Sequence, residues 1–250
     1  MPGLTIISHN IFWGQGAGFT SLPPPENPDP LVWDKLRELY LRERPDILCL
    51  QELQNRDCAD DLALKMNKAV AFCPGRKIPY YGGGIYSSLE MTGLADCRGT
   101  APPVQRMWQS VEVTGPGIGV VICNLHLPSA RQYGAERAAQ VRLEELQAVL
   151  SQERRPDIIT GDFNEKPGQG VTALMESRGY DDPAELTGNE ELETTAGGSR
   201  SDYIWIKRPL SRFIKDYRVL KNITVTREPG KKESISDHRP IRITLDFPKG

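Results

Sequence analysis

Short apolar segments of this sequence repeatedly end in side chains that can do chemistry. The segment "LTIISHN" ends at Asn10, "DILCLQE" ends at Glu52, and "DIITGDFN" ends in Asp162 and Asn164. A lone Asn or Asp beside a strand is commonly a turn former or a helix cap. Because such residues recur here, we expect them to converge on one site. The full set is Asn10, Glu52, Asn124, His126, Asp162, Asn164, Asp202, Asp237 and His238.

The chemical types in this set indicate a hard divalent metal ion. Its members supply carboxylate and amide oxygens, and none of them is a cysteine. Such donors suit Mg²⁺ or Mn²⁺, and the histidines suit an anionic substrate. The set therefore fits hydrolysis of a phosphate ester, in which a metal offsets charge and a carboxylate aligns or deprotonates water. Serine hydrolysis is disfavoured, because the sequence contains no G-x-S-x-G motif.

The elements that must position these residues alternate between strands and helices, which predicts a mixed α/β protein. A helix is expected from about residue 30, with Asp29 as its cap and Pro30 in its first turn. A second helix is expected over about 133–151, where apolar residues recur at helical spacing. The Pro- and Gly-rich stretch 13–30 between the first strand and the first helix is predicted to be a long loop.

Two segments of the sequence resemble each other: "ERPDILCLQE" and "RRPDIITGDFN" both run from a helix through Arg-Pro-Asp-Ile into an apolar strand. Asp46 and Asp157 are 157 − 46 = 111 positions apart, and Glu52 and Asp162 are 162 − 52 = 110 positions apart. The alternative is coincidence, since proline commonly closes helices. A repeated unit would bring the two strand ends together, and with them Glu52 and Asp162.

Length and composition favour one soluble domain over residues 1–250. The chain has 38% hydrophobic residues, no apolar run near the ~18 residues of a membrane span, and an amino terminus that does not resemble a signal peptide. Its five cysteines include no CxxC pair, which indicates reduced thiols rather than a zinc site or a disulfide framework. We therefore expect a cytoplasmic monomer.

Charge is nearly balanced, with a net value of −2, which argues against a protein that coats nucleic acid along a whole basic face. The distribution is uneven, since residues 207–232 hold nine Lys or Arg against two acids. This basic segment is a candidate surface for a phosphate-rich ligand. The alternative, which we favour, is that these cations lie on the solvent side of alternating strands.

The ordered motifs resemble those of the endonuclease/exonuclease/phosphatase family of metal-dependent hydrolases. They are, in the family's order, "SHN", "LQE", "GGGIYSS", "NLHL", "GDFN", "SDYIW" and "SDHRP". Each motif is weak alone, and seven in order are specific. The resemblance implies a DNase I-like fold, which is a four-layer α/β sandwich of two packed mixed sheets flanked by helices.

The same resemblance implies roles for the metal and water sites. Glu52 would be the principal metal ligand, with Asn10 and Asp237 at its edge. Asp162 would orient or deprotonate the attacking water, and Asn164 would bind phosphate or hold Asp162 in place.

The histidines complete the implied site. His238 would contact the scissile phosphate while Asp202 orients its ring, and His126 would stabilise charge on the phosphate or leaving oxygen. The spacing allows either Asp162 or His238 to be the base, and we favour Asp162. Asn124 and Arg137 are candidate substrate ligands, although a solvated helix face is the favoured reading of Arg137.

Departures from subfamily patterns bear on the substrate. Abasic-site endonucleases of the family typically carry an Asp two residues after the first Asn, where this chain has Phe12. They also have Tyr-x-Pro-Asn where this chain reads "HLPS", which begins at His126. The chain looks more like the branch of tyrosyl-DNA phosphodiesterase-like, deadenylase-like, sphingomyelinase-like and DNase I-like enzymes. We predict a phosphodiesterase acting on nucleic acid.

Two alternatives remain open. A lipid- or inositol-phosphate-directed hydrolase would need an exposed aromatic or apolar platform, for which the candidates are Trp13, Phe19, Trp108 and Trp205. The other is a binding module on the same fold without catalysis.

Overall fold

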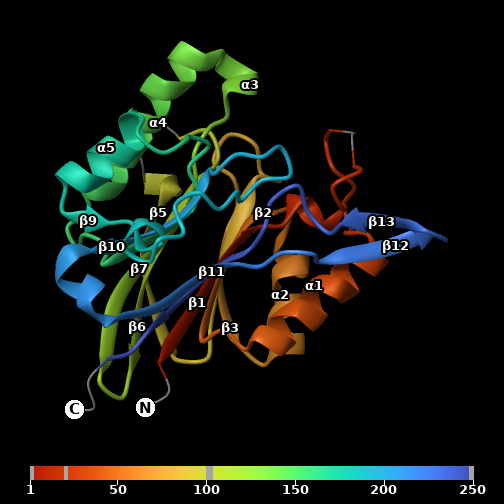
Figure 1. The fold of residues 1–250 in the computed structure, drawn as a ribbon, viewed down its shortest axis with the longest axis horizontal. Coiled ribbons are helices and arrows are strands. Elements are labelled where there is room, and N and C mark those ends of the chain that lie inside the picture. Colours follow the sequence, from red (N-terminus) through yellow and green to blue (C-terminus); the bar gives the residue numbers. More distant parts are fainter. Residues whose placement is uncertain (1–2, 20–21, 100–103, 248–250) are drawn as a thin grey trace.

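Two six-stranded sheets form the centre of the molecule in the computed structural model, which describes residues 3–19, 22–99 and 104–247 (Figure 1). The first sheet has the spatial order β11 (Ile214–Val219), β14 (Ile241–Leu245), β1 (Leu4–Asn10), β2 (Ile47–Leu53), β4 (Gly82–Ser87) and β3 (Ala69–Cys73). The second has the order β5 (Glu90–Asp96), β6 (Met107–Gly115), β7 (Ile118–His126), β8 (Ile158–Asp162), β10 (Asp202–Lys207) and β9 (Tyr180–Asp181). Both sheets are mixed.

The two sheets repeat one pattern of pairing. Each has a single parallel pair in the same place, β1 with β2 and β7 with β8, and the remaining pairs are antiparallel. A helix joins the strands of each parallel pair, namely α1 (Pro30–Glu43) in the first and α4 (Ala135–Leu150) in the second. The structure therefore agrees with the repeat in the sequence.

Equivalent aspartates start the second strand of each parallel pair. Asp46 accepts a hydrogen bond from Thr5 N at Oδ2 (2.8 Å), and its own N–H donates to Thr5 O (2.9 Å). Asp157 makes the same two bonds with Val121, at 2.8 Å and 2.7 Å. The Arg-Pro-Asp-Ile motif thus fixes the register between helix exit and strand in both units.

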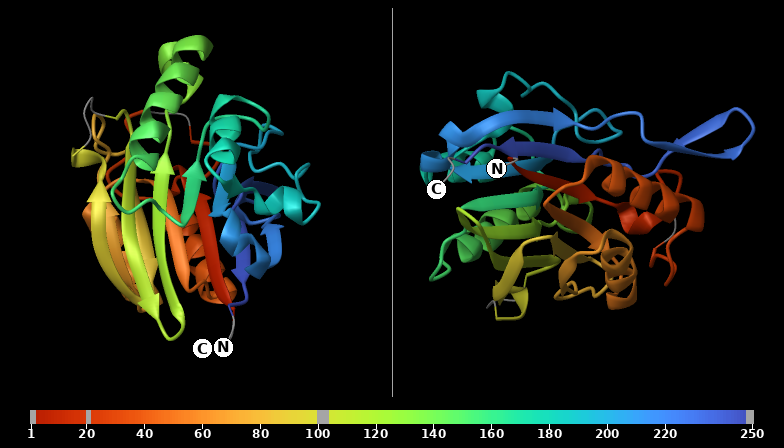
Figure 2. Two further views of the ribbon diagram at one scale, coloured as in Figure 1. Left: turned by 90° about the vertical axis from the view of Figure 1, so that its left-hand side faces the viewer. Right: turned by 90° about the horizontal axis from the view of Figure 1, so that it is seen from below.

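Helices cover the outer face of each sheet, which gives four layers (Figures 1 and 2). Helices α1 and α2 (Arg56–Met66) pack on the first sheet, and α4 and α5 (Gly170–Ser177) pack on the second. A third apolar cluster fills the space between the sheets. The central strands β1, β2 and β8 are buried along their whole length because both of their faces are covered, whereas the edge strand β5 is largely exposed and the edge strand β11 is partly exposed. The predicted four-layer sandwich is confirmed.

The structure confirms the two helices that the sequence predicts. Helix α1 begins as predicted, with Asp29 Oδ1 accepting from Val32 N (3.1 Å) and Pro30 in its first turn. The helix expected over about 133–151 is α4, Ala135–Leu150. Gly134, with φ of 75°, separates a short helix α3 (Ala130–Tyr133) from α4.

The remaining elements are short. They are η1 (Phe12–Gly14), η2 (Cys97–Gly99), α6 (Pro183–Leu186), η3 (Arg208–Phe213), β12 (Thr224–Glu228) and β13 (Lys231–Ser234). Strands β12 and β13 form a hairpin that projects from the body at the right of Figure 1. Its base is tied to the first long loop through Ala17 N and Ser234 O (2.9 Å). Within the described ranges, no helix has the length and apolar character needed to cross a bilayer.

Candidate active site

The strand ends of both sheets bring the predicted polar residues together. Asn10 ends β1, His126 ends β7 and Asp162 ends β8. The ladders pair Asn10 with Gln51 and His126 with Asp162, so each parallel pair presents two side chains at the same edge. Asp202, which opens β10, lies beside Asp162 in the antiparallel ladder.

Hydrogen bonds hold both oxygens of the Asp162 carboxylate. Its Oδ2 accepts from Asn10 Nδ2 (3.2 Å) and Asn164 Nδ2 (3.0 Å), and its Oδ1 accepts from Asn164 N (2.9 Å). His126 Nε2 lies 3.2 Å from the same Oδ2, and His238 Nε2 lies 3.7 Å from it. The carboxylate is fixed in one orientation and is 1% exposed, as a preorganised base or water-binding group requires.

His238 is held by a buried carboxylate. Its Nδ1 lies 2.9 Å from Asp202 Oδ2, which also accepts a hydrogen bond from Thr194 Oγ1 (2.6 Å). Burial alone would lower the pKa of His238, but the carboxylates of Asp202 and Asp162 outweigh it and raise that pKa well above its ordinary value. The ring is therefore cationic, with Nε2 directed at the cluster.

Glu52 has a strained backbone and an oxygen without a partner. Its φ is 56°, in the left-handed region. In the ladder with β4, Gln51 pairs with Gly83 and Leu53 pairs with Gly82, so Glu52 is the extra residue of a bulge. The bulge directs its side chain to the cluster, where Oε1 lies 3.9 Å from His126 Nε2.

Two buried carboxylate oxygens suit a metal ion. Glu52 Oε2 and Asp237 Oδ1 have no hydrogen-bond partner in the part of the chain that the structure describes. Burial raises the pKa of Asp237 and raises that of Glu52 to about 8. A divalent cation would relieve both unsatisfied oxygens. Asp162, Asp202 and His238 also offer ligand atoms within 4.8 Å of one another, but His238 Nδ1 is already bound to Asp202 Oδ2 at 2.9 Å.

Backbone strain is concentrated around this cluster. Four of the seven described non-glycine residues with positive φ lie within three residues of the ends of β1, β2 and β8: Phe12, Trp13, Glu52 and Asn164. Such conformations cost about 1–3 kcal/mol each and gather at functional sites. The local folds here position side chains at the expense of local backbone stability.

The comparison with protein families identifies the family of this chain. A profile of the endonuclease/exonuclease/phosphatase family matches residues 7–238. The chain belongs to that family. The predicted family resemblance is thereby confirmed.

Several solved structures have a fold similar to that of this chain. An AP endonuclease from Archaeoglobus fulgidus shares 18% identity with a TM-score of 0.70, over 97% of this chain and 99% of that one. The human Nocturnin catalytic domain with bound sulfate shares 21% with a TM-score of 0.68, over 99% and 94%. A mannosyl-6-phosphatase from Bacteroides thetaiotaomicron shares 18% with a TM-score of 0.67, over 98% and 100%. A sequence search of curated proteins found no match.

Sequence reasoning missed Arg106, a buried cation of this family site. Its guanidinium carbon lies 4.5 Å from the centre of the Tyr81 ring, and Nη1 contacts His126 Nε2. Burial, reinforced by this guanidinium and by His238, lowers the pKa of His126 well below its ordinary value, so the His126 ring is neutral. No sequence pattern marks Arg106, because its neighbours come from distant segments.

Sequence reasoning also left His9 without a role. His9 is buried beneath the site, where Nε2 lies 3.3 Å from His238 O and Nδ1 lies 2.8 Å from Tyr40 Oη. The carbonyl of His238 requires a proton on Nε2, so Nδ1 accepts from the Tyr40 hydroxyl. Helix α1 thus supports the loop that carries His238.

Two predicted substrate ligands lie away from the cluster. Asn124 is fully buried, donates to Leu50 O (2.8 Å) and accepts from Gln51 Nε2 (2.7 Å), so it links the two sheets. Arg137 is exposed on α4 and lies 3.7 Å from Glu144. The prediction that these two residues bind substrate finds no support in their positions.

The basic segment 207–232 is largely neutralised. Five of its nine cations form ion pairs: Lys207 with Asp157, Arg208 with Asp181, Arg218 with Asp216, Arg227 with Asp29 and Glu233, and Lys231 with Glu228. The segment therefore offers a phosphate-rich ligand less positive charge than its composition indicates.

The candidate aromatic platform is mostly core. Trp13, Trp108 and Trp205 are buried, and Phe19 is half-buried against Phe12 and Trp13. In the described ranges, the large hydrophobic side chains that are exposed are all leucines. An aromatic surface for lipid is thus not present there.

Proposed function

We propose that this protein is a Mg²⁺- or Mn²⁺-dependent phosphodiesterase. The observation that carries the proposal is the pair of unsatisfied buried oxygens, Glu52 Oε2 and Asp237 Oδ1, beside the fixed carboxylate of Asp162 and the cationic ring of His238. Glu52 and Asp237 would hold the metal, with Asn10 at its edge. The bound ion would offset the charge of the phosphoryl oxygens.

The residues of the site activate the water and bind the phosphate. Asp162 orients water and takes its proton, since Asn10 and Asn164 fix the carboxylate from one side. His238 donates a hydrogen bond from Nε2 to a phosphate oxygen, while Asp202 fixes the opposite ring nitrogen. His126, whose pKa is lowered, contacts the phosphate or the leaving oxygen as a neutral ring. A cationic His238 favours Asp162 as the base, because a protonated imidazole has no lone pair to accept a proton.

Nucleic acid is the proposed substrate. Arg131 on α3 is exposed and has no ion pair among the described residues. Its charge acts on Asp237 and Tyr81, opposing the burial that raises their pKa values. A groove of about 640 Å³ beside Asn164 is lined by Lys166 and by the opposite charge of Glu136. The exposed charge of Arg131 next to this open groove favours a polyanionic strand.

The metal proposal is tested with bis-p-nitrophenyl phosphate. Hydrolysis should require Mg²⁺ or Mn²⁺, should stop in excess chelator and should be lost in Glu52→Ala. Full activity in chelator would reject the metal. A folded wild-type protein that hydrolyses no phosphate ester with either metal would favour a binding module.

The substrate is tested in a panel at fixed salt and Mg²⁺. It contains single- and double-stranded DNA, RNA, a 5′-tyrosyl oligonucleotide, an abasic duplex, a hexose 6-phosphate, sphingomyelin and inositol phosphates. We expect the highest kcat/KM on single-stranded or end-exposed nucleic acid, falling as salt rises. Preference for either lipid or inositol substrate would replace nucleic acid and leave the metal chemistry intact.

A further inference from the structure

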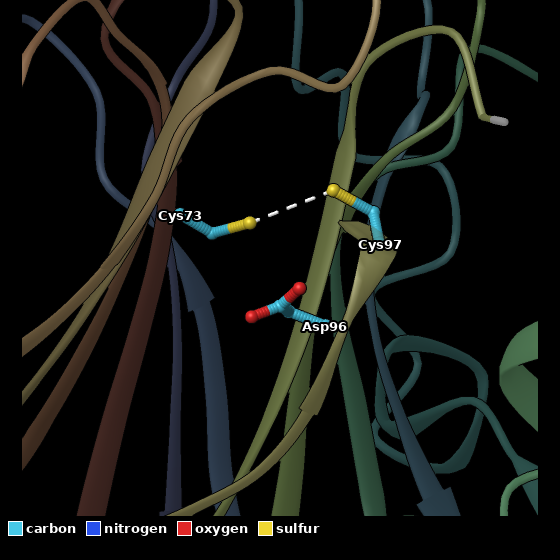
Figure 3. Close-up of side chains that lie close together, drawn as sticks. All are labelled: Cys73, Asp96 and Cys97. Atoms are coloured by element: carbon cyan, nitrogen blue, oxygen red, sulfur yellow. Dashed lines mark hydrogen bonds between the residues drawn. The ribbon is translucent and has the colours of Figure 1, made fainter. Parts of the chain in front are cut away.

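Two thiols, neither of them a residue of the candidate active site, face each other between the edges of the two sheets (Figure 3). Cys73 ends β3 in the first sheet, and Cys97 follows β5 in the second. Their Sγ atoms lie 3.5 Å apart, and both residues are buried. Closing this distance to the ~2.05 Å of a disulfide requires a movement of only about 1.5 Å.

The surroundings favour a thiol pair over a metal site. Asp96 is the third potential ligand, within 4.8 Å of both sulfurs. Its carboxylate is already bound by Arg98, whose Nε lies 2.9 Å from Oδ1 and 3.0 Å from Oδ2. A cation there would have to displace this guanidinium and tolerate its positive charge. The other close contacts of the sulfurs are carbonyl oxygens of Pro74 and Trp108, at 3.5–3.9 Å.

The two thiols differ in acidity. Their mutual hydrogen bond lowers the pKa of Cys97 and raises that of Cys73. Burial instead raises the pKa of Cys123 to about 12 and that of Cys58 to about 11. Because the thiolate is the reactive form, Cys97 is the best nucleophile of these four.

We propose that Cys73 and Cys97 form a reversible disulfide when the folded protein meets hydrogen peroxide. Cys97 thiolate attacks one peroxide oxygen, the O–O bond breaks, and protonation of the leaving hydroxide gives water and a Cys97 sulfenic acid. The Cys73 sulfur then attacks Cys97 Sγ, and the sulfenic oxygen leaves as a second water with the Cys73 proton. The two thiols lose two electrons and the peroxide gains them.

The bond would join the two sheets beside one wall of the cluster. Cys73 leads into the loop that carries Tyr81, and this loop is bonded to the Arg106 segment through Lys77 N and Gln105 O (3.3 Å). Cross-linking residues 73 and 97 should raise Tm by about 5 °C or more, since a loop of this length loses chain entropy when the protein unfolds.

The test is a count of thiols with peptide mapping. Reduced, metal-free protein is treated with hydrogen peroxide, quenched, and alkylated after denaturation. Wild type should pass from five alkylated cysteines to three, with one linked peptide joining Cys73 to Cys97 and full reversal by dithiothreitol. The matched control Cys58→Ser should give the same linked peptide, and Cys97→Ser should give none.

Several outcomes would overturn the proposal. Sulfinic acid on Cys97 without a link, a link to any other cysteine, or a lower Tm after oxidation would show that the pair is not preformed for a disulfide. Zn²⁺ retained by the reduced protein in dialysis, and lost in both Cys73→Ser and Asp96→Asn, would make the cluster a metal site. The wild-type map decides the question even if Cys97→Ser fails to fold.

Discussion

The molecule contains two strand–helix–strand units, β1–α1–β2 and β7–α4–β8, that have the same strand pairing. We call this shared arrangement the frame, and the two units differ in the residues that end its second strand. Asp46 and Asp157 hold the same register in both units. In the ladders, however, the position equivalent to Asp162 is Gln51, because Asn10 pairs with Gln51 as His126 pairs with Asp162. Glu52 is one residue further, at a bulge. One unit therefore ends in a hydrogen-bonded carboxylate and the other in an unsatisfied one.

This difference indicates two separate demands on a carboxylate. A group that orients water must be held by donors, as Asp162 is. A group that binds a metal must keep an oxygen free, as Glu52 does. The shared strand pairing brings both carboxylates to the same site, and the last one or two residues of each strand determine whether the carboxylate is held by donors or left free for a metal.

The largest expected effect comes from exchanging each carboxylate for its amide. Binding of Mg²⁺ should raise the Tm of the wild-type protein. Asp162→Asn should lower kcat by about 10³-fold or more, since it removes the base, and should keep this rise in Tm. Glu52→Gln should lower activity and also abolish that rise in Tm. Activity assays and thermal scans with and without Mg²⁺ measure both. If the two variants lose the metal response equally, the two ends do not differ in role.

The next effect concerns the histidine that closes the site. His238→Ala should lower kcat by about 10²-fold or more. Asp202→Asn should lower kcat by about 10-fold, because the amide can still orient the ring and Asp162 still favours its cationic form. Arg137→Ala, on the helix of the second unit, is the control and should keep near wild-type kcat and KM. Near-normal turnover of folded His238→Ala would leave the histidine as a turn residue.

The shared frame predicts matched losses of stability. Asp46→Ala and Asp157→Ala should each lower the free energy of unfolding by about 1–3 kcal/mol, because each leaves a backbone N–H without its acceptor. Urea denaturation measures the change, and Asp34→Ala on the exposed side of α1 should cost about 0.5 kcal/mol or less. A large loss in one unit alone would argue against equivalent frames.

The smallest expected effect is a change in the pH dependence of stability that comes from His9, a buried histidine of the first unit. Burial lowers the pKa of His9 to about 3, so the folded state keeps this ring neutral while the unfolded chain protonates it near its ordinary pKa. Stability from His9 is present above about pH 6.5 and is lost as the pH falls below it, by about 1.4 kcal/mol at pH 5.5. His9→Gln should therefore lose less stability than wild type between pH 7.5 and 5.5 in urea titrations. Equal losses would contradict it.

Much of the frame was predictable because it follows from local patterns. Apolar strands, the Asp29 cap and the Arg-Pro-Asp-Ile repeat are all short-range signals, and they predicted a mixed α/β protein and the convergence of Glu52 with Asp162. The four-layer sandwich was implied by the resemblance of the ordered motifs to the family. The bulge at Glu52 was hidden, since a spacing of 110 rather than 111 does not say which residue leaves the ladder.

Contacts between distant segments were not predictable. Arg106 meets His126 and Tyr81 only in the folded chain, and the cations of the basic segment find their acids as far away as Asp29. Composition records such charges without their partners. For the same reason Asn124, with nothing local to distinguish it from a ligand, was predicted to bind substrate although it links the sheets.

The placement of β14 has a consequence for synthesis. Leu4 in β1 pairs with Leu245 in β14, which is 245 − 4 = 241 residues later. While the ribosome makes the chain, β1 waits with one edge unpaired until β14 emerges, and an unpaired apolar edge is a template for aggregation. Asp237 and His238 arrive with that same last strand. A nascent chain therefore lacks two residues of the candidate site, and needs protection of this edge, until β14 has been translated.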